Sequence, residues 1–168
     1  MKKYEILLVD DDLNVLTVIA CALEDKGYQV TTASSGEVAI EALSIKDFDL
    51  VITDLNMHET DGIAVLKKAK ELNPVCGVMI LTASRDRAFA IEALRVGADD
   101  YMLKPCNLSK LWDRVAKCLE RSELRLSHGR PEWRVPHQAT SSEHKEVQLW
   151  AGGRLSLLPD AFLPERSH

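Results

Sequence analysis

Leu50-Val51-Ile52-Thr53-Asp54 is a short, mostly apolar run that ends in one carboxylate, and it decides the fold expected of this chain. A run without alternating polar positions is typical of a strand that is buried on both faces of its sheet. Three further apolar runs also stop at a charged or hydroxyl-bearing residue. They are residues 6–9 before Asp10, residues 78–81 before Thr82, and residues 101–103 before Lys104.

Segments with a helical spacing of apolar residues alternate with these runs. Gly27 and Gly97 follow two of the segments and are typical of helix ends, and Asn73-Pro74 stops another. Ser34 with Glu37 three residues later is a capping-box pattern at a helix start. The sequence predicts strands at residues 6–9, 28–33, 50–53, 78–81 and 101–103, and helices at residues 13–26, 34–45, 62–72, 88–96 and 108–119.

Five strand–helix units with continuously apolar strands predict an α/β domain over residues 1–121. We expect a doubly wound (βα)5 flavodoxin-like sandwich with a parallel sheet in the order 2-1-3-4-5. In such sheets, ligands bind beyond the carboxyl ends of the strands, where the strand order reverses. This order brings Asp10, Asp11 and Asp54 together, because the first and third strands end side by side.

The composition is that of a globular protein, which we expect in the cytoplasm. The chain has 168 residues, is 46% hydrophobic and carries a net charge of -5, which gives no general attraction to nucleic acid or anionic membranes. No stretch approaches the roughly 20 apolar residues of a membrane span. The four cysteines form no CxxC pair and have no histidine at zinc-ligand spacing, so reduced, partly buried thiols are expected.

Residues 122–168 differ in composition from the part before them. They hold four of the five histidines and four of the six prolines, and they show no convincing helical period. Such a segment is expected to be a disordered linker or tail, or the start of an output region. Two short apolar runs flank Gly152-Gly153 and make residues 147–157 a candidate hairpin.

The residues at the strand ends suit phosphate chemistry. Close carboxylates repel one another, so they raise one another's pKa or share a cation, and hard oxygen ligands favour Mg²⁺ or Mn²⁺. The ammonium of Lys104 and the hydroxyl of Thr82 would bind the oxygens of a transferring phosphoryl group. Asp54, alone on the middle strand, suits the role of phosphoryl acceptor.

This ordered set of strand-end motifs resembles the receiver domain of two-component response regulators over about residues 3–121. The resemblance implies a signalling switch rather than an enzyme with turnover. Asp54 would accept phosphate from a sensor histidine kinase or a histidine phosphotransfer protein. The matching motifs are Val9-Asp10-Asp11, Thr53-Asp54-Leu55-Asn56-Met57, Asp61-Gly62, Leu81-Thr82-Ala83 and Tyr101-Met102-Leu103-Lys104-Pro105.

The resemblance also implies a role for each residue of the site. Thr82 and Lys104 would bind the phosphoryl oxygens, and the Lys104-Pro105 bond would be cis. Tyr101 would move together with Thr82 and switch a surface formed by the fourth helix, fifth strand and fifth helix. The implied Mg²⁺ ligands are Asp11, Asp10 through a water, Asp54, and Asn56 through its backbone carbonyl.

One position departs from the family pattern, and some polar residues have a plainer interpretation. His58 stands where the loop usually has proline, which bears on the rigidity of the loop and the lifetime of the phosphoryl group. Ser84 borders the site and is expected to tune hydrolysis. The plainer interpretations are helix caps at Asp12 and Asp61, a solvated turn at Asp99 and Asp100, and a core position for Trp112.

A competing interpretation is an aspartate-nucleophile phosphohydrolase, in which Asp10 and Asp12 form a DxD pair after the first strand. That class also needs an acidic pair at a strand end after the lysine, and beyond Lys104 only a helix with Asp113 follows. The interpretation leaves Asp54 without a role.

The output of the switch stays open at this level. Residues 122–168 are too few and too irregular for a usual winged-helix effector and contain no helix-turn-helix pattern, so we expect no direct nucleic-acid binding by them. A stand-alone receiver and the first part of a longer regulator both fit. We expect a homodimer to form on phosphorylation, with the face from the fourth to the fifth helix as its interface.

Overall fold

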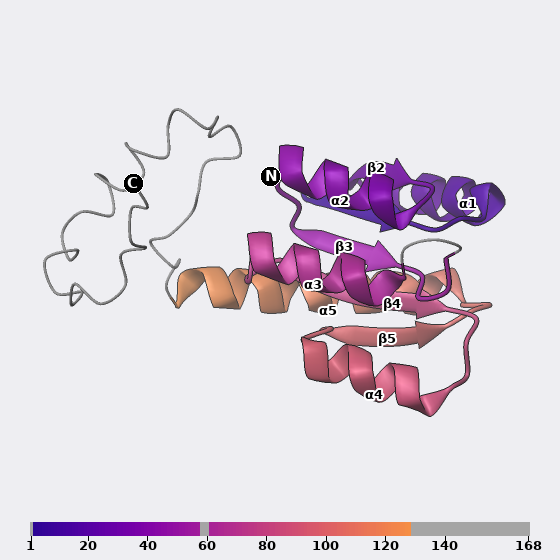
Figure 1. Ribbon diagram of the computed structural model, residues 1–168. Coiled ribbons are helices and arrows are strands. Elements are labelled where there is room, and N and C mark those ends of the chain that lie inside the picture. The colour runs from indigo at the N-terminus through magenta and orange to yellow at the C-terminus, as the bar shows by residue number, and fades with distance from the viewer. Residues whose placement is uncertain (1, 58–60, 129–168) are drawn as a thin grey trace, which may run out of the picture. The chain divides into compact units, whose positions relative to one another are not determined.

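A computed structural model describes residues 2–57 and 61–128 of the chain. In this part, five strands alternate with five helices (Figure 1). The strands are β1 (Glu5–Val9), β2 (Gln29–Ala33), β3 (Leu50–Thr53), β4 (Gly77–Thr82) and β5 (Asp100–Leu103). The helices are α1 (Leu13–Glu24), α2 (Gly36–Ile45), α3 (Gly62–Leu72), α4 (Arg87–Val96) and α5 (Leu108–Ser127). Among these described helices, none is both long and apolar enough to cross a membrane.

The strands form one parallel sheet in the order β2-β1-β3-β4-β5, which confirms the expected fold and strand order. Val9 of β1 lies opposite Thr53 of β3. The N–H of Asp54 donates to the Val9 carbonyl over 2.9 Å and continues this pairing by one step. The residues that follow the two strands, Asp10 and Asp54, therefore leave the sheet as neighbours.

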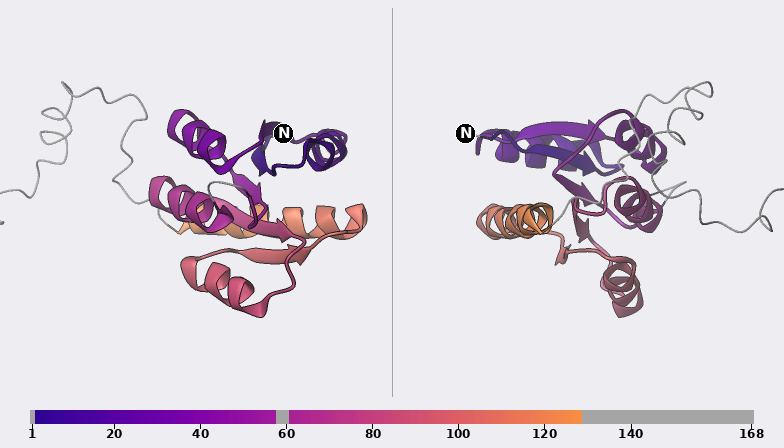
Figure 2. Two further views of the ribbon diagram at one scale, coloured as in Figure 1. Left: turned by 45° about the vertical axis from the view of Figure 1, so that its right-hand side comes forward. Right: turned by 90° about the vertical axis from the view of Figure 1, so that its left-hand side faces the viewer.

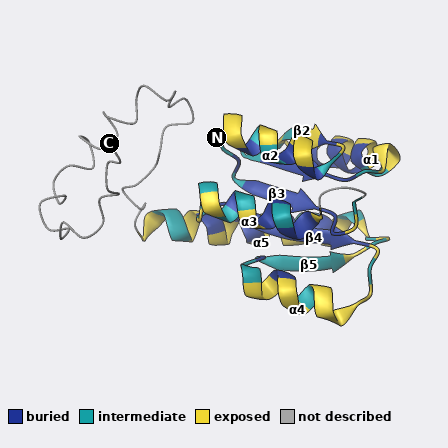
Figure 3. Cartoon of the chain, in the orientation of Figure 1, coloured by how far each residue is buried: buried dark blue, intermediate teal, exposed yellow. Residues whose placement is uncertain are grey.

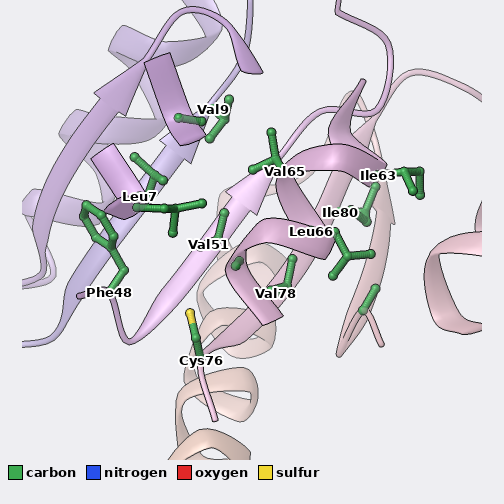
Figure 4. Packing of buried hydrophobic residues seen from close by; sticks show 14 of the residues in the cluster. Leu7, Val9, Phe48, Val51, Ile63, Val65, Leu66, Cys76, Val78 and Ile80 are labelled. Atoms are coloured by element: carbon green, nitrogen blue, oxygen red, sulfur yellow. The ribbon is translucent and has the colours of Figure 1, made fainter. Parts of the chain in front are cut away.

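Helices cover both faces of the sheet, so the strands are buried from two sides. Figure 2 shows α2, α3 and α4 over one face and α1 and α5 over the other. Two buried clusters result: a first core between the sheet and α2, α3 and α4, and a second core between the sheet and α1 and α5. Along β3, Val51 belongs to the first core (Figure 4), whereas Ile52 belongs to the second. Every residue of β3 and β4 is buried (Figure 3), which explains why these runs lack polar alternation.

Side chains before the helices and one glycine after them set the helix ends. Asp12 caps α1 and Asp61 caps α3, as expected, because each carboxylate accepts backbone N–H groups of the first turn. Gly97 ends α4 in the left-handed region at a φ of 111°. At α2 the expected cap is wrong by one residue, since Ser35 rather than Ser34 accepts a backbone N–H.

α5 runs to Ser127, well beyond the expected end at Leu119. The expectation that no helix continues past residue 121 is therefore wrong for residues 122–127. Polar contacts hold these last turns, as when the Ser122 hydroxyl donates to the Val75 carbonyl over 2.5 Å. Hydrophobic periodicity does not report such contacts. The candidate hairpin at residues 147–157 lies outside the described residues.

The expected solvated turn at Asp99 and Asp100 is also wrong. The Asp99 carboxylate accepts hydrogen bonds from the Val78 N–H (2.8 Å), Lys70 Nζ (2.9 Å) and Arg125 Nη2 (2.5 Å). Asp100 is the first residue of β5. Asp99 thus ties α3, β4 and α5 together at the amino edge of the sheet.

Trp112 packs against the second core, as expected, but it is only partly buried. The Lys26 ammonium lies 4.2 Å from the centroid of its ring, so a cation from the turn after α1 covers the indole. Within the described part of the chain, Trp112 Nε1 is buried without a hydrogen-bond partner.

All four cysteines are free, in agreement with the expected reduced thiols. Cys76 and Cys118 are buried, whereas Cys21 is exposed. Burial raises the pKa of the Cys76 thiol to about 12 and that of Cys118 to about 11. Both buried thiols are therefore protonated at neutral pH.

Candidate functional site

The polar residues that the sequence singled out lie at the carboxyl ends of β1, β3, β4 and β5. Asp10 follows β1 and Asp54 follows β3, and these residues are only 3% and 7% exposed. Thr82 is the last residue of β4 and is fully buried. Lys104 follows β5, and its N–H donates to the Thr82 carbonyl over 2.8 Å. The topology therefore gathers the residues that the sequence singled out.

Three carboxylates and one ammonium form the centre of the site. Asp10, Asp11 and Asp54 each offer one oxygen atom, and these atoms lie within 4.8 Å of one another. Lys104 Nζ pairs with Asp10 Oδ2 and also with Asp54 Oδ2, the latter at 3.0 Å. The Asn56 N–H donates to the other oxygen of Asp54, Oδ1, over 3.2 Å. One lysine thus partly neutralises two buried carboxylates.

The two partners of the Asp10–Lys104 pair both have raised pKa values, for different reasons. Burial raises the pKa of Asp10, against the opposing effect of its hydrogen bond to Lys104. Burial alone would lower the pKa of Lys104, but hydrogen bonds to Asp10 and Asp54 outweigh it and raise that pKa. Lys104 is therefore a cation at neutral pH, whereas burial makes the ionised form of Asp10 unfavourable.

Thr82 and Tyr101 both bind the backbone of Ser84, in the loop between β4 and α4. The Thr82 hydroxyl oxygen accepts the Ser84 N–H over 3.2 Å, and the Tyr101 hydroxyl donates to the Ser84 carbonyl over 2.9 Å. Burial raises the pKa of Tyr101, so its hydroxyl remains a donor. The Lys104-Pro105 bond is cis, as expected.

The residues present fit a hard divalent cation. All three side chains of the cluster are carboxylates, and Mg²⁺ prefers oxygen ligands of this kind. Asp12 lies outside this cluster, because its Oδ1 accepts the N–H groups of Asn14 and Val15 as a helix cap. His58, with its expected effect on the loop, lies outside the described residues.

Two residues at the site received no role from sequence reasoning. The Thr53 hydroxyl donates to the carbonyl of Asp54 over 2.9 Å. Gly62 packs so closely on the same carbonyl that a side chain would overlap it. The Gly62 contact forms only when the start of α3 returns to the end of β3, whereas the Thr53 bond joins adjacent residues. The sequence signals were a hydroxyl beside Asp54 and a small residue at a helix start, and neither is specific.

Comparison with known proteins decides the family. The sequence matches the response regulator receiver domain over residues 6–116, from β1 into α5. The chain belongs to this family. Its receiver domain also resembles solved structures. A CheY-like receiver domain protein from Methanospirillum hungatei JF-1 is 27% identical with a TM-score of 0.72, over 74% of this chain and 99% of that one.

Curated relatives of this receiver domain are transcriptional regulatory proteins. ZraR of Escherichia coli (strain K12) is 44% identical over 115 residues, which cover 68% of this chain and 26% of ZraR. The alkaline phosphatase synthesis transcriptional regulatory protein PhoP of Bacillus subtilis (strain 168) is 32% identical over 158 residues, which cover 94% of this chain and 62% of PhoP. The chain thus spans about a quarter of ZraR and less than two thirds of PhoP.

Proposed function

We propose that Asp54 accepts a phosphoryl group from the phosphohistidine of a sensor histidine kinase or a histidine phosphotransfer protein. The observation that supports this most directly is the pairing of Lys104 with both Asp54 and Asp10, beside three carboxylates within 4.8 Å. An acceptor, a cation and a set of metal ligands are the parts that phosphoryl transfer to a carboxylate needs.

In the proposed reaction, a carboxylate oxygen of Asp54 forms the new bond to phosphorus while the bond from phosphorus to the donor's histidine nitrogen breaks. That nitrogen keeps the electron pair of the broken bond. Lys104 and the Thr82 hydroxyl bind the oxygens of the transferred group. Mg²⁺, or Mn²⁺ in its place, would be held by Asp10, Asp11, Asp54 and the Asn56 carbonyl, and would neutralise charge on the phosphoryl group.

The test uses acetyl phosphate and Mg²⁺ on the full chain, with intact mass as the readout. We expect one phosphoryl group on the wild type, none on Asp54→Asn, and none on the wild type when a chelator removes the metal. An equal gain of mass in Asp54→Asn would disprove the proposal.

The structure also bears on the phosphohydrolase alternative. That mechanism needs the second carboxylate of the Asp10–Asp12 pair at the reacting phosphate, whereas Asp12 caps α1. Measurement of phosphate release separates the two functions. A hydrolase would lose turnover in Asp10→Asn and keep it in Asp54→Asn, whereas the switch loses its labile adduct in Asp54→Asn.

The proposed output surface is the face formed by α4, β5 and α5. Ala93 is the only buried residue among the ten of α4, while Phe89, Ile91 and Leu94 are 41%, 50% and 55% exposed. Three exposed apolar side chains on one helix favour a protein partner, for which we propose a second copy of the phosphorylated chain. Sedimentation with beryllofluoride tests this, and a species that stays monomeric contradicts it.

We further propose that the switch controls transcription. The match to PhoP covers 158 residues, so it includes at least 30 residues beyond residue 128, where the described part ends. Residues after the receiver domain therefore also resemble part of a transcriptional regulatory protein. The measurement is the change in transcript levels between cells that carry the wild type and cells that carry Asp54→Asn, and unchanged transcripts would refute the proposal.

A further inference from the structure

Gly62, the first residue of α3, packs directly on the backbone of the proposed phosphoacceptor. A Cβ atom built on Gly62 would lie 1.9 Å from the carbonyl oxygen of Asp54, 2.9 Å from its carbonyl carbon and 3.0 Å from Leu55 Cα. All three atoms belong to the backbone and cannot rotate aside as a side chain does. The constraint at Gly62 is therefore space, and any side chain there displaces either α3 or Asp54.

Two hydrogen bonds hold the two peptide groups that follow Asp54 and Leu55. The Thr53 hydroxyl, which is fully buried, donates to the Asp54 carbonyl over 2.9 Å. The Gly62 N–H donates to the Leu55 carbonyl over 3.0 Å. The end of β3 is thus fixed by its own last residue and by the first residue of α3.

The carboxylate of Asp54 depends on this placement because its partners come from other strands. Lys104 reaches it from β5 at 3.0 Å, and the cluster with Asp10 and Asp11 needs ligand atoms within 4.8 Å. Misplacement of a reacting group by about 1 Å costs roughly 100-fold in rate.

We propose that Thr53 and Gly62 are positioning residues for phosphoryl transfer, which hold the Asp54 backbone so that its carboxylate meets both Lys104 and the metal ligands. This rests on the proposed phosphorylation of Asp54. It adds two residues that touch neither the phosphoryl group nor the metal.

Gly77 supplies a control glycine, which is less tightly crowded than Gly62 and lies away from Asp54. A Cβ atom there would lie 3.0 Å from Leu50 Cδ1 and 3.4 Å from the Cys118 carbonyl oxygen. Gly77 begins β4, at the opposite edge of the sheet from Asp54. Gly77→Ala therefore strains the packing without touching the end of β3.

The experiment compares Gly62→Ala, Thr53→Val and Gly77→Ala with the wild type. Three quantities are measured: the phosphorylation rate constant with acetyl phosphate at saturating Mg²⁺, the Mn²⁺ dissociation constant from electron paramagnetic resonance, and stability from urea unfolding. For Gly62→Ala we expect a rate at least about tenfold lower and weaker Mn²⁺ binding, with a smaller loss in Thr53→Val. Gly77→Ala should match the wild type in rate and metal binding even where its stability falls.

The inference is wrong if Gly62→Ala and Thr53→Val both keep the wild-type rate and Mn²⁺ affinity. It is also wrong if Gly77→Ala loses as much rate and affinity as Gly62→Ala, because the effect would then be one of general destabilisation. If Gly62→Ala does not fold, Thr53→Val decides alone, since it replaces one hydroxyl by a methyl group. If the wild type takes no phosphate on Asp54, the proposed function fails, and Mn²⁺ binding still decides whether the two residues position the carboxylate.

Discussion

At the scale of single residues, Asp10 shows a conflict between the site and the stability of the fold. Its pKa is raised chiefly by burial, so the ionised form is less favourable in the folded chain than in the unfolded chain. The folded state is therefore favoured fully at pH values below the ordinary pKa of the carboxyl group. That advantage is lost as the pH rises through the ordinary value to the raised one. At neutral pH, ionised Asp10 lowers stability.

Asp10→Asn should therefore stabilise the chain by about 1 kcal/mol at pH 7, because Lys104 keeps its partner Asp54 while one buried charge is removed. Urea unfolding at pH 7 and in acid measures the effect, which should shrink where wild-type Asp10 is protonated. Asp12→Asn is the control, since Asp12 is exposed and caps a helix. A lower stability of Asp10→Asn at pH 7 would contradict this account.

At the scale of elements, Asp99 determines how far α5 persists. Its carboxylate joins Lys70 of α3 and Arg125 of α5. Arg125 lies beyond Leu119, where the apolar period of the helix ends. The last turns of α5 are thus held by this ion pair together with the hydrogen bond of Ser122, and they should open more easily than the rest of the helix.

Asp99→Asn should cost about 1 to 3 kcal/mol of stability and speed amide hydrogen exchange over residues 120–127, because two cations lose their carboxylate. Exchange followed by mass spectrometry measures this. Asp113→Asn, at an exposed position of the same helix, is the control. Equal exchange of these turns in Asp99→Asn and the wild type would show that the ion pairs do not hold α5.

The same elements differ in how far the sequence alone predicts them. The five strands and the gathering of Asp10, Asp54 and Lys104 at one edge were predictable, since continuous apolar runs and parallel topology determine them. The last turns of α5 and the approach of Gly62 to Asp54 were not. Both depend on specific contacts between different elements, whereas periodicity reports only which residues face a core.

At the scale of the whole molecule, the two buried thiols limit stability in alkali. In the unfolded chain a thiol ionises near its ordinary pKa of 9.0, whereas folded Cys76 and Cys118 keep their protons to about 12 and about 11. The unfolded state therefore releases protons first, and stability falls as the pH rises above about 9, by about 1.4 kcal/mol per pH unit for each thiol.

Urea unfolding in reducing buffer between about pH 9 and pH 11 tests this decline. Cys76→Ala with Cys118→Ala should lower stability at neutral pH, through lost packing, yet flatten the alkaline decline. Cys21→Ala, at an exposed position, should keep the wild-type slope. A decline of the same steepness in the double variant would rule out the thiols as its cause.

The length of α5 affects how a change at Asp54 can reach the far end of the receiver domain. The helix begins shortly after Lys104 at the reactive edge, and Arg125 meets Asp99 at the other edge, so its 20 residues span about 30 Å. Charges in solution are screened over about 8 Å at physiological salt. The Arg125 end of α5 therefore lies too far from the reactive edge to respond directly to the charge of a phosphate on Asp54. At that end of the helix, phosphorylation would act through a tilt or shift of α5 rather than through its charge.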